Sequence, residues 1–285
     1  MLKTLASCCL LLIFATTAVA DLSTSYRRLL PLEGGSNFRD MGGYTTKDGK
    51  TIVRGKLFRS GVMTSLTEED MSYLNQFKFK TIVDLRSDEE LELYPNHWAI
   101  SSEIPMILGN YSIREMMAAS DNKGDRPKMS ELYPRILESI QPQLVRYFDA
   151  ALANQVPMVV NCSAGQDRTG VTAALMLMLL GVPEETVIED YLLSTDFRRP
   201  LTEQGDVDLA AAAKSNSFAA MMLHYHNASP NPNRPNPLVT AEGKPFLVFV
   251  FDYIRKNHGT IEAYAEQELG IDEKDIQVLR HQYLL

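Results

Sequence analysis

The stretch "VVNCSAGQDRTG", Val159 to Gly170, separates two apolar runs of different length. Before it, Pro157 to Val160 form a short apolar run, which is typical of a buried parallel strand. After it, residues 171–180 are apolar all round and end at Gly181, which predicts a buried helix. The sequence therefore predicts a strand, a tight loop and a helix in this order, with Cys162 where the strand ends.

The predicted loop has the composition of an anion-binding turn. The free N–H groups of a helix's first turn and of the loop before it point into one cup. Small residues such as Ser163, Ala164 and Gly165 let the backbone fold tightly enough to form this cup. A helix N-terminus and the guanidinium of Arg168 both favour a thiolate, and that guanidinium can offer two parallel donors to a phosphoryl group. We therefore expect Cys162 to be a nucleophile, whereas a packed cysteine on a tight turn is the structural alternative.

The first residues resemble an export signal. Lys3 precedes an uncharged apolar stretch from Leu5 to Ala18, and Ala18-Val19-Ala20 fits the small-x-small cleavage pattern. The stretch is shorter than the ~20 residues of a membrane-spanning helix, the rival interpretation. We expect cleavage after Ala20, a mature chain that begins at Asp21 and no later membrane span, and hence a secreted or periplasmic protein.

Cysteine content and net charge narrow the class of protein further. The chain has three cysteines, and Cys8 and Cys9 would leave with the signal, so Cys162 would be the one thiol of the mature protein. The net charge of −8 provides no basic field for nucleic acid or anionic lipid, so nucleic acid is not an expected partner. An anionic substrate must then be bound locally, by a site such as the cup.

The pattern Cys162-x5-Arg168-Thr169-Gly170 resembles the signature loop of the cysteine-dependent protein tyrosine phosphatases. Other stretches resemble one bacterial family of these enzymes, named by its Asn-Phe-Arg-Asp opening, whose mycobacterial and listerial members are secreted phosphatases of broad specificity. These stretches are "SNFRDMGGY" (Ser36 to Tyr44), "LFRSG" (Leu57 to Gly61), "TIVDLRSDEEL" (Thr81 to Leu91), "IEDYLLS" (Ile188 to Ser194) and "HGTIEAYAEQELGI" (His258 to Ile271). The resemblance covers roughly residues 30–285, and the motifs occur in the family's order.

The resemblance implies an α/β fold, with a central, mostly parallel sheet flanked by helices, in one domain over residues 21–285. It implies hydrolysis of phosphomonoesters through a phosphocysteine at Cys162, without a metal or cofactor. The oxygens of the phosphoryl group would be bound by Arg168 and by the loop residues Ser163, Ala164, Gly165 and Gln166. Thr169 would donate a hydrogen bond to the sulfur, cap the helix, or both. The chain departs from the family at Asn161, where a histidine is usual, and at Gln166, where broad-specificity members have lysine.

Two aspartates compete for the role of proton donor to the leaving group. Asp167 lies in the loop and resembles the aspartate that has this role in bacterial relatives. Asp84 ends the predicted strand Thr81–Asp84, where α/β sheets carry functional groups, but it could instead pair with Arg86 or with an arginine of the opening motif. Three residues of the opening motif, Phe38, Arg39 and Asp40, are expected to shape the wall of the substrate pocket, although Arg39 and Asp40 could instead form an ion pair with each other.

Further patterns predict the surrounding elements. A helix capped by Thr67 is expected before the strand Thr81–Asp84, and one long helix over Glu131–Leu152. An insertion at about residues 200–240 combines a helix near Leu209–Leu223 with "HNASPNPNRPNPL", His226 to Leu238. This Asn/Pro-rich segment is either a lid over the cup or a variable surface loop.

The resemblance leaves the substrate open. A protein tyrosine phosphatase, with or without dual specificity, would act on phosphorylated proteins, whereas an inositol phosphate or phosphoinositide phosphatase could use the same loop. Outside this class, the alternatives are a rhodanese-like sulfurtransferase and an inactive phospho-binding module. Fold alone does not choose between them.

Overall fold

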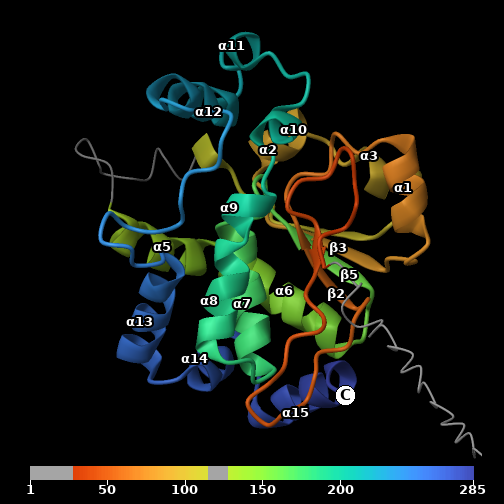
Figure 1. Ribbon diagram of the computed structural model, residues 1–285, viewed down its shortest axis with the longest axis vertical. Coiled ribbons are helices and arrows are strands. Elements are labelled where there is room, and N and C mark those ends of the chain that lie inside the picture. Colours follow the sequence, from red (N-terminus) through yellow and green to blue (C-terminus); the bar gives the residue numbers. More distant parts are fainter. Residues whose placement is uncertain (1–27, 115–127) are drawn as a thin grey trace, which may run out of the picture.

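Five strands form the central sheet of the computed structural model, which describes residues 28–114 and 128–285 (Figure 1). Their spatial order is β1-β2-β5-β3-β4, and only β1 runs antiparallel to its neighbour. The strands are β1 (Arg39–Asp40), β2 (Leu57–Ser60), β3 (Thr81–Asp84), β4 (Met106–Leu108) and β5 (Met158–Asn161). The expected mostly parallel sheet is confirmed, and the two predicted strands are β3 and β5.

The expected signal peptide, residues 1–20, lies outside the described residues. Among the helices that the structure does describe, none has both the length and the apolar character needed to cross a bilayer.

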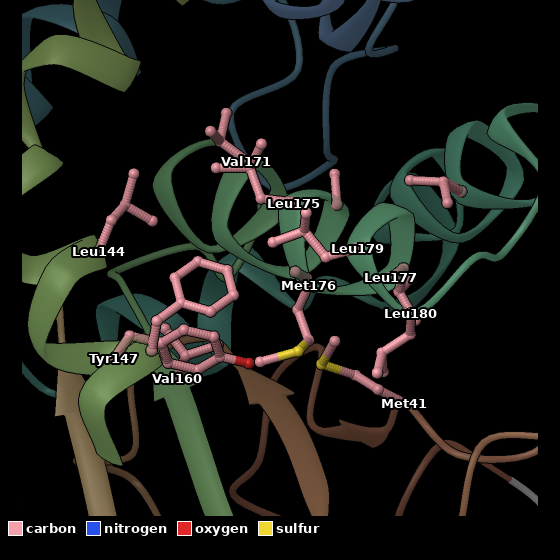
Figure 2. Close-up of a cluster of buried hydrophobic side chains, with 14 of the residues drawn as sticks. Met41, Leu144, Tyr147, Val160, Val171, Leu175, Met176, Leu177, Leu179 and Leu180 are labelled. Atoms are coloured by element: carbon pink, nitrogen blue, oxygen red, sulfur yellow. The ribbon is translucent and has the colours of Figure 1, made fainter. Parts of the chain in front are cut away.

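The central strand β5 and helix α7 (Arg168–Leu179) form the core of the molecule. Met158 and Val160 face the larger hydrophobic cluster, which includes most of α7, whereas Val159 faces a second cluster on the other side of the sheet. Figure 2 shows side chains of α7, such as Met176, lying with Val160 and Tyr147 in the larger cluster. The predicted strand–loop–helix order is therefore confirmed, because both apolar runs are buried as their composition requires.

Helices cover both faces of the sheet. The smaller cluster packs under α1 (Glu68–Asn75) and α3 (His97–Ser101). The larger cluster includes residues of the remaining covering helices: α5 (Met129–Ser139), α6 (Gln141–Leu152), α7, α8 (Glu184–Leu192), α13 (Leu247–His258), α14 (Ile261–Leu269) and α15 (Glu273–Tyr283). The fold is thus a three-layer α/β arrangement with the cup loop at one end of the sheet.

The expectation of one helix over Glu131–Leu152 is wrong. The chain forms α5 and α6 there, with Ile140 between them. Pro142 lies in the first turn of α6. Proline has no N–H to continue the preceding helix, but it fits the first turn of a new one.

Capping boxes begin two of the helices near the sheet. Thr67 and Asp70 exchange side-chain and backbone hydrogen bonds at the start of α1, as the sequence predicts. Ser87 and Glu90 do the same at the start of α2 (Asp88–Leu93). The second box fixes the backbone around Glu90, which matters for the site.

The insertion lies beyond one end of the sheet, at the top of Figure 1. It follows α9 (Ser194–Phe197) and contains α10 (Pro200–Gln204), α11 (Leu209–Ala212) and α12 (Ser217–Ala228). The expected helix near Leu209–Leu223 is therefore two helices, because the Asn216 side chain accepts a hydrogen bond from Ala219 N and begins α12 anew. Phe218 of α12 packs with Val62 and Tyr94 in a small hydrophobic cluster of its own.

Candidate active site

The loop between β5 and α7 forms the floor of a cavity of about 540 Å³. Cys162, Ser163, Ala164, Asp167 and Arg168 all line this cavity. Cys162 has a free thiol and is only 2% exposed. A molecule must therefore enter the cavity to reach the sulfur.

Carbonyl groups of the cup loop are bound from behind. Asn37 Nδ2 donates to the carbonyl oxygens of Ala164 at 3.2 Å and of Gly165 at 2.8 Å. Arg59 Nη2 also donates to the Gly165 carbonyl, at 2.9 Å. Asn37 and Arg59 are buried and do not line the cavity, so these two carbonyls are directed away from it.

The N–H groups of the same loop remain available. Between Ser163 and Arg168, no backbone N–H donates to an acceptor within the described ranges 28–114 and 128–285. Such a run of unpaired donors before a helix is the arrangement that binds phosphate and stabilises oxyanions. The loop therefore has the geometry that the sequence predicts for an anion cup.

Gly165 is required by close packing as well as by its backbone conformation. Its φ is +62°, and a Cβ built there would lie 2.5 Å from the backbone nitrogen of Gly61. Both conditions exclude larger residues without movement of the backbone. The "LFRSG" motif thus includes the glycine against which the cup loop is seated.

A buried carboxylate holds the arginines behind the cup. Asp190 pairs with Arg39 at 3.1 Å and with Arg59 at 2.5 Å, and it accepts a hydrogen bond from Tyr44 at 2.9 Å. Burial alone would raise the pKa of the Asp190 carboxyl, but the two guanidinium groups hold it well below its usual range. Three of the sequence motifs therefore meet in one ion-paired cluster that supports the loop.

The expected substrate contacts of Arg39 and Asp40 are wrong. Both residues are fully buried and neither lines the cavity. Arg39 pairs with Asp190 instead of Asp40, whose carboxylate accepts from the backbone nitrogens of Gly42 and Gly55, each at 2.7 Å. These residues support the site from behind because their charges are satisfied inside the protein.

Arg168 is fixed by Glu90 in a two-bond ion pair. Nη1 lies 2.7 Å from Oε2, and Nη2 lies 2.6 Å from Oε1. Burial would lower the pKa of Arg168, but the Glu90 carboxylate raises it well above its ordinary value. Arg168 is thus a permanent cation in a fixed orientation.

Sequence reasoning missed Glu90, although a signal existed. Ser87 and Glu90 have the spacing of a capping box, which would have placed a buried glutamate at the start of a helix. The pattern does not reveal that the same carboxylate also accepts from Ser163 Oγ at 2.5 Å and from Arg168.

The two candidate proton donors, Asp167 and Asp84, differ in their burial and in their access to the cavity. Asp84 is fully buried and bound by Arg86, whose Nε lies 2.8 Å from Oδ1 and whose Nη2 lies 2.7 Å from Oδ2. Its expected contact with substrate is therefore wrong. Asp167 lines the cavity, and its Oδ1 accepts a hydrogen bond from the hydroxyl of Tyr133. Of the two aspartates, Asp167 is the one that lines the cavity.

Arg198 is a further cation of the cavity, beside Arg168 and Arg234, that the sequence did not indicate. Its Nη1 donates to Gln166 Oε1 at 2.6 Å, and its Nε and Nη2 bind the two carboxylate oxygens of Glu203 at 3.1 Å and 2.7 Å. Arg198 and Glu203 both line the cavity. Gln166 is therefore held by Arg198.

Two polar side chains of the motif, Thr169 and Asn161, are buried without a hydrogen-bond partner among the described residues. The hydroxyl of Thr169 is buried and has no hydrogen-bond partner among the described residues, so it neither bonds the thiol nor caps α7. The amide of Asn161, which stands where the family usually has histidine, is likewise buried without a partner in the described part of the chain. The ring of donors consists of the backbone N–H groups and Arg168.

Residues of the insertion, at about positions 200–240, form a second part of the cavity wall. Its apolar contribution comes from Leu209, Phe218, Met221, Met222, Tyr225 and three prolines, at positions 230, 232 and 235. Within residues 28–114 and 128–285, no group of three or more histidine, cysteine, aspartate or glutamate side chains could hold a metal ion. The cavity thus has a polar floor, and its insertion side combines apolar residues with polar ones such as Glu203, Arg234 and Asn236.

Comparison with known proteins identifies this arrangement. The tyrosine phosphatase family matches residues 30–285. A putative tyrosine-protein phosphatase of Cupriavidus necator is 28% identical over 189 residues, which are 62% of this chain and 67% of that one. A tyrosine-protein phosphatase of Nostoc commune is 28% identical over 49% of this chain and 48% of its own. The triple specificity protein phosphatase PtpB of Mycobacterium tuberculosis is 25% identical over 58% of this chain and 68% of its own.

The chain spans about half to two thirds of the length of these relatives. The family match is broader: it includes the cup loop, the two arginines and the aspartate behind it, and the glutamate that orients Arg168. The chain therefore belongs to the tyrosine phosphatase family.

Proposed function

We propose that this cysteine-dependent phosphatase hydrolyses phosphotyrosine in proteins, in two steps, through a phosphocysteine at Cys162. The observation that carries the proposal is the cup itself. The backbone N–H groups from Ser163 to Arg168, in the loop that follows Cys162, have no acceptor among the described residues, and Glu90 orients the Arg168 guanidinium, which lines the same cavity as Cys162. These donors match the three equatorial oxygens of a phosphoryl group in transfer.

In the first step, the Cys162 sulfur attacks phosphorus in line with the leaving oxygen. The cup donors bind the oxygens on which charge develops, and they are already oriented because the loop is held by Asn37 and Arg59. Asp167, which lines the cavity next to Arg168, protonates the departing phenolate oxygen. In the second step, the same carboxylate takes a proton from the water that attacks the phosphocysteine.

The depth of the thiol favours phosphotyrosine over phosphoserine. Cys162 is 2% exposed and is reached through the cavity. A tyrosine ring carries its phosphate farther from the peptide backbone than a serine side chain does. Phe218, Met221 and Met222 give the cavity apolar surface on which an aromatic ring can pack. We expect dual specificity, if present, to be the minor activity.

The inositol phosphate alternative requires cations for additional phosphates. Besides Arg168, two arginines line the cavity. The charge of Arg198 is neutralised by Glu203 in a two-bond pair, which leaves Arg234 for an additional phosphate. Gln166 is uncharged and is already bound by Arg198. We therefore propose that inositol phosphates and phosphoinositides are poorer substrates than phosphotyrosine peptides.

A substrate panel tests the proposed function. We expect kcat/KM to be highest for phosphotyrosine peptides and lower for phosphoserine peptides and inositol phosphates. Cys162→Ser removes activity toward all of them. Higher kcat/KM for a phosphoinositide in vesicles would replace our proposal with the lipid alternative, and turnover of thiosulfate would indicate a sulfurtransferase.

We also propose that the segment from His226 to Leu238 closes over the cup as a lid. Residues 226, 228–230, 232 and 234–236 line the same cavity as Cys162, so a ligand in the cup would lie beneath them. Limited proteolysis with and without vanadate tests the lid. Protection near Asn231 by vanadate supports it, and an unchanged cleavage pattern contradicts it.

Finally, we propose that the enzyme is exported. The uncharged apolar stretch from Leu5 to Ala18 and the small-x-small sequence that ends at Ala20 support cleavage there. Amino-terminal sequencing of protein recovered from the periplasm or the medium should begin at Asp21. Recovery in the cytosol with Met1 intact would contradict export.

A further inference from the structure

Two buried tyrosines, Tyr191 and Tyr133, form a chain of hydrogen bonds that ends at Asp167. The hydroxyl of Tyr133, a residue that is 1% exposed, donates to Asp167 Oδ1. The hydroxyl of Tyr191, which is fully buried, lies 2.5 Å from that of Tyr133. Because Tyr133 has one hydroxyl proton and gives it to the carboxylate, Tyr191 must be the donor in the second contact. The hydrogen bonds therefore run in one direction, from Tyr191 to Tyr133 to Asp167.

Packing fixes the positions of both rings. A Cβ built on Gly170 would lie 2.9 Å from Cδ2 of Tyr191, so the glycine that follows Thr169 leaves room for this ring against the first turn of α7. The rings of Tyr133 and Tyr191 meet edge to face, with centroids 6.3 Å apart. Phe246 lies 5.5 Å from the Tyr133 ring, centroid to centroid. The hydroxyl groups are thus held where they are by three packed rings and one glycine.

The hydroxyl of Tyr133 stays protonated throughout the range in which enzymes work. Burial raises its pKa well above that of an ordinary tyrosine, and the adjacent Asp167 carboxylate raises it further. Tyr133 is therefore always a donor to Oδ1 and never a base. Among the residues that the structure describes, the other carboxylate oxygen, Oδ2, has only a long contact, at 3.4 Å from Gln166 Nε2.

We propose that Tyr133 is a positioning residue for the phosphatase reaction: by holding Asp167 Oδ1, it makes Oδ2 the oxygen that delivers and later removes the catalytic proton. This inference rests on the proposed role of Asp167 as general acid. It goes beyond that role, because it assigns the proton to one oxygen and gives the tyrosine pair a function in catalysis.

The proton balance of the two steps follows from this assignment. In the first step, a bond forms between sulfur and phosphorus while the bond from phosphorus to the leaving oxygen breaks, and that oxygen takes the proton of Oδ2. In the second step, the carboxylate accepts at Oδ2 one proton of the attacking water. The bond from water oxygen to phosphorus forms, and the electron pair of the broken sulfur–phosphorus bond returns to sulfur. Tyr133 keeps its proton throughout.

The test is the dependence of kcat/KM on the leaving group in Tyr133→Phe. A phenolate leaving group needs a proton, whereas 2,4-dinitrophenolate departs without one. We expect kcat/KM for phenyl phosphate to fall about tenfold, a part of the ~10²-fold or more that a general acid contributes. We expect kcat/KM for 2,4-dinitrophenyl phosphate to change less than about twofold, because the cup itself is intact.

Tyr147→Phe is the matched control. Tyr147 is also fully buried in the larger hydrophobic cluster, but its hydroxyl has no hydrogen-bond partner among the described residues. Its removal should leave the ratio of the two kcat/KM values unchanged. Tyr191→Phe is the second variant: it keeps the contact of Tyr133 with Asp167 but removes the donor behind it, so we expect the same selective loss to a smaller extent.

Three outcomes overturn the proposal. The first is an equal loss on both substrates in Tyr133→Phe, which would show a structural role alone. The second is an unchanged ratio in a folded Tyr133→Phe protein. If Tyr133→Phe does not fold, an unchanged ratio in Tyr191→Phe is the third. In each case, hydrolysis of both esters by the wild-type enzyme still supports the proposed function, whereas failure of the wild type to hydrolyse either ester contradicts the function itself.

Discussion

Arg168 and Glu90 lie 78 positions apart in the chain and form two nearly parallel hydrogen bonds, of 2.7 Å and 2.6 Å. Glu90 is fully buried, and the side chain of Arg168 is 19% exposed. The pair leaves the guanidinium partly open to the cavity while it removes the rotational freedom of the long side chain. The orientation of the substrate-binding cation is therefore built into the folded protein before substrate arrives.

Glu90→Gln tests this orientation. The amide cannot form the same charged pair, so we expect kcat/KM for an aryl phosphate to fall about 10²-fold. We also expect the free energy of unfolding to decrease by about 3 kcal/mol, because a largely buried cation loses its partner. Steady-state kinetics and urea unfolding measure the two effects. Glu262→Gln, an exposed change that does not touch the cavity, is the control; an equal effect in both variants would refute a specific role for Glu90.

Asp190→Asn tests the buried cluster behind the cup. Because the folded state holds the pKa of Asp190 below its usual range, the carboxylate stabilises the protein fully above about pH 4, and this contribution declines as the pH falls. We expect a loss of about 3 kcal/mol at pH 7. The difference from wild type should be about 1 kcal/mol smaller at pH 3.

Urea unfolding at the two pH values makes this comparison. The exposed Asp206→Asn should match the wild type at both. A difference between wild type and Asp190→Asn that grows on acidification would have the wrong sign for our account.

Asn37→Asp tests the support of the loop carbonyls. The carboxylate replaces a donor that binds the oxygens of Ala164 and Gly165, and it repels both of them. We expect the loop to shift, with a fall of about 10²-fold in kcat and weaker inhibition by orthophosphate. Asn257 also donates its amide to a backbone carbonyl, that of Tyr253, but on the surface. Unaltered phosphate inhibition in Asn37→Asp would contradict a role for Asn37 in shaping the cup, and Asn257→Asp should change neither quantity.

Gly165→Ala and Gly243→Ala separate backbone strain from close packing. Both glycines have positive φ, of +62° and +85°, so each substitution costs about 1 kcal/mol in the backbone alone. A Cβ at position 243 meets nothing within 4 Å, whereas one at position 165 lies 2.5 Å from Gly61 N. We expect Gly243→Ala to keep full activity and Gly165→Ala to lose nearly all of it in a phosphatase assay. Retained activity in Gly165→Ala would mean that the loop need not be seated against the "LFRSG" motif.

The sequence was sufficient to predict the strands, helices and caps that depend on residues close together in the chain. The β5–loop–α7 unit, the strand Thr81–Asp84 and the cap at Thr67 follow from short apolar runs and cap spacings, and all are present. The break between α5 and α6 could have been predicted as well, because Pro142 is a local signal.

Pairings between distant segments could not be predicted in the same way. The charges of Arg39 and Asp40 look accessible in the sequence, but the fold buries both beside partners and neither lines the cavity. The pair of Asp84 with Arg86 is different, because the two residues are neighbours and the sequence offered this pairing as an alternative. Arg198 and Tyr133 reach the site from segments with no distinctive pattern. The tertiary structure determines which buried charged residues pair with each other.

The central claim is that Cys162 carries the phosphoryl group between the two steps, and trapping the intermediate tests it most directly. The enzyme is mixed with a ³²P-labelled phosphotyrosine peptide, quenched in detergent within the first turnover and digested, and the labelled peptide is identified by mass spectrometry. We predict one phosphoryl group on the peptide that contains Cys162 and none in Cys162→Ser. With labelled 2,4-dinitrophenyl phosphate, whose leaving group needs no proton, we predict a larger amount in Asp167→Asn, which lacks the base for the second step. A label on another residue, or full turnover with no label on Cys162 in either active form, would contradict the account.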